Sequence, residues 1–165
     1  MPSVRLGVHG RRWVLWLGVG VVVAASLAGR ASAGLTFVVT TTADSGPGSL
    51  RQAISDANAN AGLDTIAFAI PGGGVHTIQP LTALPVVTDP VVIDGRTEPG
   101  WEFPGPPVVQ LLGPGKSPAT FDYLIGAGLE IDGGRSVVEG LAVGGFGTGI
   151  DLESSGNDII QFDVV

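Results

Sequence analysis

The sequence contains no cysteine. This absence excludes a disulfide framework, a thiolate zinc site and a cysteine nucleophile. Positive charge is also scarce, with eight lysines and arginines against 15 aspartates and glutamates. Such a chain lacks the basic surface on which nucleic-acid binding depends, so we expect no nucleic-acid partner.

Glycine, by contrast, is abundant and accounts for 27 of the 165 residues. The glycines follow no three-residue period, which excludes a collagen triple helix and indicates many tight turns. Hydrophobic residues make up 44% of the chain and charged residues 14%, a balance typical of a folded protein and not of a disordered one. The length suits a single domain.

Residues 1–33 have the three parts of a secretory signal. A positively charged segment with Arg5 and the Arg11-Arg12 pair precedes 17 uncharged residues, 13–29, and the small residues 31–33 form a cleavage site. A membrane-spanning helix needs about 20 apolar residues, so we expect cleavage after Ala33 and no lasting membrane span. The protein is then secreted or held at the cell surface through the Sec route, with the twin-arginine route as the alternative.

Cleavage would make the chain more acidic. It removes four of the eight basic residues and none of the 15 acidic ones, which leaves a formal charge of 4 − 15 = −11. A surface of this charge repels anionic partners unless a cation intervenes. The partners we expect are a polysaccharide or another surface protein.

One helix is predicted, over residues 49–60. Ser49 is expected to cap its first turn, and Gln52, three residues later, to complete a capping box. The apolar residues share one face at helical spacing: Leu50, Ala53, Ile54 and Ala57. A lone amphipathic helix must dock on other elements. We therefore expect residues 34–63 to form a strand and a helix that caps the strands after them.

Residues 64–165 alternate short β-branched segments with turns rich in glycine, proline and aspartate. Segment 128–132 returns as 149–153, 21 residues later, and segment 136–143 returns more loosely as 158–165. Residues 109–111 precede 129–131 by 20. Counting the segment before the helix, the expected strands are 36–42, 65–70, 75–79, 91–94, 108–112, 129–132, 137–143, 150–153 and 159–165.

A period of 20–22 residues predicts an all-β solenoid, a parallel β-helix. Alternation along its strands would place Ile150 and Leu152 inside, and Asp151 and Glu153 outside. The alternative fold is a β-sandwich, which accounts for the strands but not for the period.

The run DSGPGSLRQAI at residues 44–54, followed by Asp56-Ala57-Asn58, resembles a known family. It is similar to the CSLREA-type segment that heads secreted right-handed parallel β-helix proteins of the pectin-lyase-like class, with Gly48 in place of the cysteine and Gln52 in place of the glutamate. The resemblance extends over about residues 36–160. It implies the right-handed fold and export, but no single activity, because lyases, hydrolases and adhesins share this fold.

No set of residues forms a catalytic constellation. A lyase of this type needs a basic residue and carboxylate-bound calcium, and a hydrolase needs paired carboxylates at the scissile bond. We expect a non-catalytic N-terminal portion of an exported β-helix protein, acting as scaffold, adhesin or carbohydrate-binding surface. The alternatives are the start of a polysaccharide lyase or glycoside hydrolase with its catalytic coils beyond residue 165, and a small self-associating protein.

Four acidic residues recur in the repeat, and stacking would bring them together: Glu130, Asp132, Asp151 and Glu153. A solvated acidic face is the expectation, and a calcium site is the alternative. No other cofactor is expected.

Other polar and aromatic residues receive structural interpretations. We expect Arg96 and Arg135 to be solvated in Asp-Gly turns, and His76 to be a surface or packing residue. Trp101 and Phe103 lie in a loop and are expected to cover the side of the fold, with sugar stacking as the alternative.

The C-terminal strand 159–165 is apolar and no cap follows it. Solenoids need polar caps at their ends. We therefore expect the chain to be a fragment of a longer protein, with self-association through this strand as the alternative.

Overall fold

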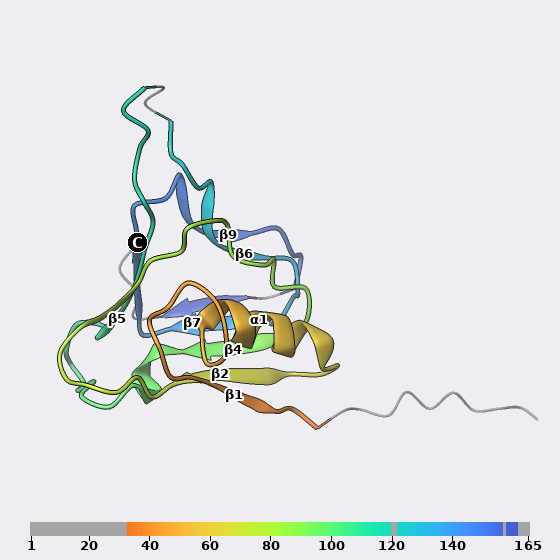
Figure 1. The fold of residues 1–165 in the computed structure, drawn as a ribbon. Coiled ribbons are helices and arrows are strands. Elements are labelled where there is room, and N and C mark those ends of the chain that lie inside the picture. The colour runs from red at the N-terminus through yellow and green to blue at the C-terminus, as the bar shows by residue number, and fades with distance from the viewer. Residues whose placement is uncertain (1–32, 120–121, 157, 162–165) are drawn as a thin grey trace, which may run out of the picture.

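The computed structural model describes residues 33–119, 122–156 and 158–161. Within them the chain forms short strands in three parallel sheets, with little helix (Figure 1). The expected signal segment lies outside the described residues except for Ala33, which is exposed. No helix in the described ranges has the length and apolar character to cross a membrane.

Ten strands, one α-helix and one 3-10 helix make up the described part of the chain. The helices are α1 (Leu50–Ala59) and η1 (Gly95–Thr97). The strands are β1 (Thr36–Val39), β2 (Asp64–Phe68), β3 (His76–Ile78), β4 (Val91–Asp94), β5 (Val109–Leu112), β6 (Ala127–Ile131), β7 (Val137–Glu139), β8 (Leu141–Gly144), β9 (Thr148–Leu152) and β10 (Ile159–Gln161).

The sheets have the orders β1-β2-β4-β7-β10, β3-β5-β8 and β6-β9. The chain visits them in a recurring sequence, because β4, β5 and β6 belong to the first, second and third sheet, and so do β7, β8 and β9. Every pair of named strands is parallel. Immunoglobulin-type sandwiches are built from antiparallel sheets, so this pairing argues against the sandwich alternative.

The pairing corrects one of the sequence repeats. Leu129 pairs with Ile150, the predicted offset of 21, but Val109 pairs with Leu141, 32 residues later, and not with Leu129. The reason is the long connection that separates β5 from β6 and places them in different sheets. In the first sheet, Val92 pairs with Val137, 45 residues away, so the period of 20–22 holds only for the last strands.

The strand expected over 137–143 is two strands. Gly140 separates β7 from β8 with a φ of 71°, and the two belong to different sheets. A left-handed residue cannot continue a strand, so the chain turns a corner there.

The hydrophobic core gathers side chains from α1 and all three sheets. The largest fully buried apolar ones are Phe68, Leu50, Ile54, Ile66, Ile78, Ile93, Leu111, Leu129, Ile131 and Leu141. Ile150 packs against this core, but Leu152, predicted to point inside, is 40% exposed. Leu152 ends β9, the edge strand of its sheet among the described residues, so no described strand covers it from that side.

Side chains at the strand starts also tie neighbouring strands together. The N–H of Leu35 donates to Asp64 Oδ1 at 2.7 Å, and the N–H of Val91 donates to Ser136 Oγ at 3.2 Å. The N–H of Ser136 in turn donates to Asp158 Oδ1 at 2.8 Å. Each of these bonds satisfies a backbone donor just outside a ladder, where it would otherwise lack a partner.

Helix α1 packs on β1 and β2, and all four residues of its predicted apolar stripe are buried. Ser49 caps the helix, since its Oγ accepts the N–H of Gln52 at 3.2 Å. The second half of the expected capping box is absent. The Gln52 side chain donates to Asp56 Oδ1, and the N–H of Ser49 donates to the carbonyl of Gly46 instead.

Candidate functional site

The outer face of the β3-β5-β8 sheet carries a row of uncharged side chains. Thr77, Gln110 and Ala142 are in register across the three strands, and the Thr77 hydroxyl donates to Gln110 Oε1 at 3.2 Å. Their neighbours along the strands are buried on the opposite face. This alternation leaves the row facing outward, with Leu112 and Gly144 paired beyond it.

An open groove of about 200 Å³ lies on this face between β5 and β8. It is lined by Gln110, Leu111, Leu112, Ala142, Val143 and Gly144. None of these residues carries a charge, which sets the groove apart in so acidic a chain. Ala142 has a small side chain and Gly144 has none, so β8 leaves room beside Gln110 and Leu112 of β5.

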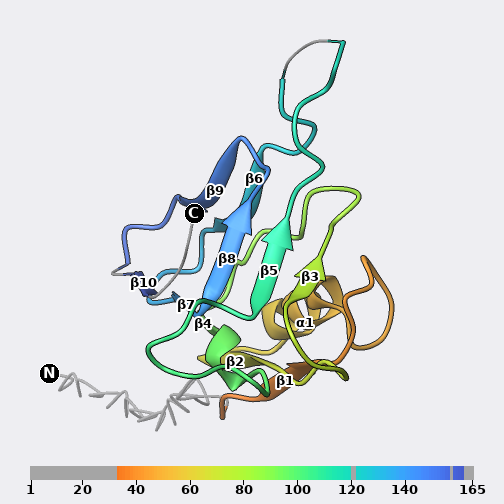
Figure 2. The same ribbon diagram turned by 90° about the vertical axis from the view of Figure 1, so that its left-hand side faces the viewer.

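Two loops lie at opposite ends of β5 (Figure 2). Residues 98–108 lie at the foot of β5 and β8, and the described residues 113–119 and 122–124 rise beyond the other end of β5 as the two arms of a protruding hairpin. The Lys116 ammonium lies 4.9 Å from the centroid of the half-exposed Tyr123 ring. Each loop carries an exposed aromatic residue, Phe103 in the first and Tyr123 in the second.

The aromatic residues of the first loop only partly follow the prediction. Trp101 is half-buried, but Phe103 is 67% exposed and does not cover the fold as expected. The two ring centroids are 6.2 Å apart, with the planes tilted by 45°. The alternative of an exposed stacking surface therefore fits Phe103 better.

A buried pair anchors the start of that loop. Glu98 has a fully buried side chain, and its Oε2 accepts the N–H of Ile70 at 2.9 Å. His76 Nε2 lies 3.3 Å from Glu98 Oε1. Of the two roles expected for His76, surface or packing, the structure shows packing. Glu98 was not predicted as a buried residue, because its neighbours in the sequence do not indicate a buried acid.

Arg96 was expected to be solvated, but it is only partly exposed and is ion-paired. Its guanidinium donates to both carboxylate oxygens of Asp94, at 2.9 and 3.2 Å, and also to Glu139 Oε1. Asp94 and Glu139 are paired in register, so the arginine sits between two stacked acids. The hydrogen bonds to Asp94 raise the pKa of Arg96, although burial opposes them in part. Arg135 is exposed, with a φ of 69° in its turn.

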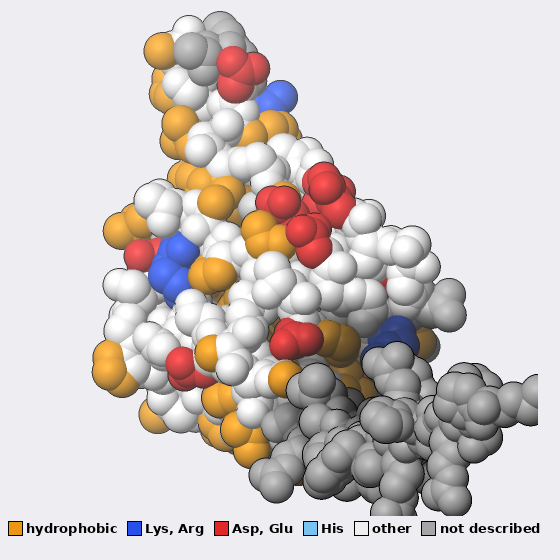
Figure 3. Space-filling view, turned by 90° about the vertical axis from the view of Figure 1, so that its right-hand side faces the viewer, with side chains coloured by type: hydrophobic (Ala, Val, Ile, Leu, Met, Phe, Trp, Pro, Cys, Tyr) orange, Lys and Arg blue, Asp and Glu red, His pale blue; other side chains and the backbone are white. Residues whose placement is uncertain are grey.

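The four repeated acidic residues lie on β6 and β9 or directly after them. Glu130 pairs with Asp151, and Asp132 and Glu153 follow the two strands in the same register. Figure 3 shows acidic side chains gathered on one face of the molecule. Among the described residues, no group of three or more acidic, histidine or cysteine side chains has metal-binding geometry. The calcium alternative for these four remains a prediction.

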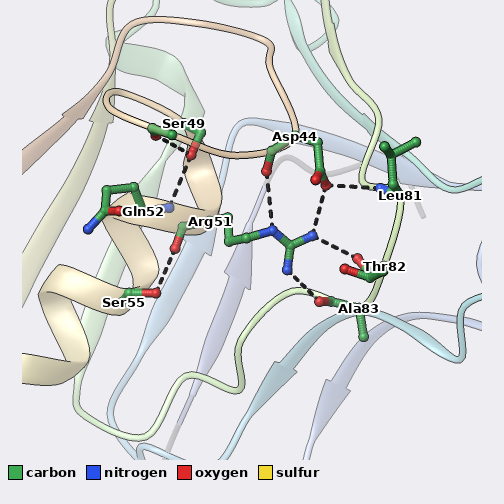
Figure 4. A network of polar contacts seen from close by, with 9 residues as sticks. Asp44, Ser49, Arg51, Gln52, Ser55, Leu81, Thr82 and Ala83 are labelled. Atoms are coloured by element: carbon green, nitrogen blue, oxygen red, sulfur yellow. Dashed lines mark hydrogen bonds and ion pairs between the residues drawn. The ribbon is translucent and has the colours of Figure 1, made fainter.

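A network around α1 joins three segments of the chain (Figure 4). Arg51 donates to Asp44 Oδ1 at 2.8 Å and to the carbonyls of Thr82 and Ala83 at 2.9 and 2.6 Å. Asp44 Oδ1 also accepts the N–H of Leu81 at 2.9 Å. The turn before the helix, the helix and segment 81–83 are thus held by one guanidinium and one carboxylate.

Asn58 makes a second connection from the other end of α1. Its side-chain amide donates to the carbonyl of Val86 at 2.7 Å and accepts the N–H of Thr88 at 2.9 Å. Between them, Val87 bridges to Ile131 of β6. The helix therefore fixes the segment that extends the β6-β9 sheet, a role the sequence analysis did not assign to Arg51 or Asn58.

The Asp44–Arg51 pair predicts a pH dependence of stability. The hydrogen bond from Arg51, followed by that from the Leu81 N–H, lowers the pKa of Asp44. A carboxylate with a lowered pKa stabilises the fold above its unfolded-state pKa, and this contribution is lost as the pH falls through its folded-state pKa. Asp44→Asn should therefore be less stable than the wild type at neutral pH, with a deficit that shrinks in acid.

Urea denaturation from pH 7 to pH 3 measures this deficit. Asp132→Asn is the matched control, because Asp132 is an exposed aspartate that follows β6. A deficit for Asp44→Asn that stays constant across this range would contradict the assignment.

No family model, curated protein or solved structure matches this chain.

Proposed function

We propose that this chain folds as a right-handed parallel β-helix, is exported, and acts without catalysis, as a scaffold with a carbohydrate-binding surface. The surface is the groove between β5 and β8. The observation that carries the proposal is this uncharged open groove, with a loop at each end of β5 that exposes an aromatic residue.

The strand arrangement supports the β-helix. Parallel strands return to the same three sheets in the same order, and side chains in register stack on one another across them. Helix α1 packs on β1, the edge strand of the first sheet, and on β2, and this position would suit a solenoid cap. The charged run at the N-terminus supports export.

Carbohydrate fits the groove for reasons of shape and chemistry. The groove is open to solvent along the paired strands β5 and β8, so a sugar chain could lie across them. It is bound by uncharged hydrogen-bonding groups and by aromatic rings that cover its C–H faces, and Gln110, Phe103 and Tyr123 offer both.

Blocking the groove tests the proposal. Ala142→Gln would place a longer side chain between β5 and β8 without adding charge, and we expect it to weaken oligosaccharide binding about tenfold or more. Ala67→Gln is the matched control, since Ala67 is a half-buried residue of β2 in the other large sheet. It should bind as the wild type does.

Binding is best measured by nuclear magnetic resonance titration of the isotope-labelled chain with oligosaccharides. Shift changes are expected at the amides of β5 and β8. Changes confined to other sheets, or equal loss of affinity in both variants, would refute the groove as the site. Release of reducing ends or of unsaturated products during the titration would contradict the non-catalytic role.

A further inference from the structure

We propose that Asp64 is the binding site for the N-terminus that removal of residues 1–33 creates. The new α-ammonium group of Gly34 pairs with the buried carboxylate of Asp64 and fastens the start of β1 to β2. This inference goes beyond the carbohydrate surface and rests only on the export in the proposed function. Three observations carry it: the burial of Asp64, the state of its second oxygen, and the position of Gly34.

Asp64 is a fully buried acid at the start of β2. Its Oδ1 accepts the N–H of Leu35 and the side-chain amide of Asn60, both at 2.7 Å. Its Oδ2 is buried as well, and no described group donates a hydrogen bond to it. A buried carboxylate oxygen without a donor costs free energy, and folded proteins usually supply such an atom with a donor or a cation. Oδ2 is therefore an acceptor for one further group.

The side-chain cations of the described residues do not take this place. Arg51 makes its ion pair with Asp44, and Arg96 makes its ion pairs with Asp94 and Glu139. In the part of the chain that the structure describes, no lysine or arginine forms an ion pair with Asp64. A positive charge for its carboxylate must therefore come from another kind of group, and a chain terminus is one.

Gly34 lies against the segment that carries Asp64. A Cβ added at Gly34 would collide with the Leu63 carbonyl oxygen and lie 3.9 Å from the Asp64 Cα. The next residue, Leu35, already donates its N–H to the Asp64 carboxylate. Three covalent bonds separate the Gly34 nitrogen from the Leu35 nitrogen, so these two atoms lie within about 4 Å of each other. The Gly34 nitrogen is thus held beside the carboxylate by its neighbour.

Cleavage after Ala33 changes the chemistry of this nitrogen. Hydrolysis of the Ala33–Gly34 peptide bond by a signal peptidase consumes one water and leaves a carboxylate on Ala33 and an ammonium group on Gly34. The neutral amide with one N–H becomes a group with three N–H donors, which is mostly protonated at pH 7. Cleavage also frees rotation about the Gly34 backbone, so that one donor can turn toward Oδ2. Hydrogen bonds from an ammonium to a carboxylate are about twice as strong as neutral ones.

The new pair would stabilise the edge of the first sheet. β1 begins two residues after Gly34, pairs in parallel with β2, and is the edge strand of that sheet among the described residues. Helix α1 packs on the same two strands. A tie at the start of β1 therefore holds the surface on which α1 docks, and the processed chain is more stable than its precursor.

Urea denaturation of the exported chain in a Lys116→Arg background tests the inference. Lys116 is the one lysine of the sequence, so this background leaves the α-amine as the only amine to react. The chain is expressed with residues 1–33 and recovered after export, and mass spectrometry identifies its first residue. Acetylation in urea followed by refolding then restores a neutral amide at that nitrogen. We expect acetylation to raise the equilibrium constant of unfolding about tenfold or more.

A second substitution assigns this effect to Asp64. In Asp64→Asn, which keeps an acceptor for the Leu35 N–H but has no charge, acetylation should change the equilibrium constant by less than about twofold. Asp132→Asn is the matched control, because Asp132 is an exposed aspartate that follows β6, and it should keep the full effect. If Asp64→Asn does not fold, a chain cut to begin at Ala33 replaces it. Its ammonium lies one residue, about 3.8 Å, further along the chain, so acetylation should have little effect.

The outcomes separate this inference from the proposed function. No effect of acetylation on the exported chain, or equal effects in Asp64→Asn and Asp132→Asn, would overturn the inference and leave the proposed function standing. So would an exported chain whose first residue is not Gly34, or a chain beginning at Ala33 that is as sensitive to acetylation as the one beginning at Gly34. Failure of the chain to be exported would overturn both the inference and the export on which it rests.

Discussion

Replacing Ile54 with aspartate is expected to lower the free energy of unfolding by more than about 4 kcal/mol. Ile54 is fully buried between α1 and the sheets, together with Leu50 and Ala57. The other side chains of the apolar stripe offer a carboxylate at this position neither a positive charge nor a hydrogen-bond donor. Either the charge is buried unpaired, at a large desolvation cost, or α1 leaves β1 and β2 and exposes core surface.

The loss should extend beyond the helix. Arg51 and Asn58 connect α1 to segments 81–83 and 86–88, so displacement of α1 breaks those contacts too. We expect a single cooperative unfolding transition at a lower urea concentration than in the wild type. The fluorescence of Trp101, the one tryptophan outside residues 1–33, monitors this transition.

Two further variants make this result specific. Ser55→Asp adds the same charge on the exposed side of the same helix and should change the free energy of unfolding by no more than about 0.5 kcal/mol. Ile54→Ala removes volume without adding charge and should cost about 3 kcal/mol, which remains measurable if Ile54→Asp does not fold. Equal stability of Ile54→Asp and Ser55→Asp would refute the docking of α1.

The helix was predictable because its signals are local. An apolar residue at every third or fourth position specifies a buried face whatever that face packs on, and Ser49 caps the residues directly after it. The partners of Arg51 were not predictable, since backbone carbonyls some 30 residues away have no signature in the sequence. For the same reason, the role of Asn58 became evident only in the structure.

The strand pairing was predictable only where the connections are short. Leu129 pairs with Ile150 at the expected offset, but the loop 98–108 and the long connection between β5 and β6 lengthen the paths that lead to β7 and β8. Such insertions lie outside the parallel ladder, so they leave its register intact. They also make the distances between paired strands unequal, so no constant period is visible in the sequence. They also carry Phe103 and Tyr123, so the same insertions that hid the repeat supply the aromatic part of the candidate site.

The chain turns a corner after β4, at Gly95, and another after β7, at Gly140, and these two glycines are in contact. A Cβ added at Gly95 would lie 2.2 Å from the Gly140 carbonyl oxygen and 2.7 Å from its carbonyl carbon. A Cβ added at Gly140 would lie 2.6 Å from the Arg96 Cγ, at a φ of 71°. The close approach lets Arg96 cross above Gly140 and reach Glu139 as well as Asp94.

Gly95→Ala is therefore expected to destabilise the protein by about 2–4 kcal/mol, because backbone atoms and not a flexible side chain must move to admit one methyl group. Gly140→Ala should cost at least as much, since it adds the strain of a left-handed alanine to the same contact. Gly73→Ala is the control, because a Cβ there meets nothing within 4 Å, and it should change stability by no more than about 0.5 kcal/mol. Urea denaturation ranks the three variants. If Gly95→Ala proved as stable as Gly73→Ala, the two corners would not be in contact, and the register that pairs β4 with β7 would be wrong.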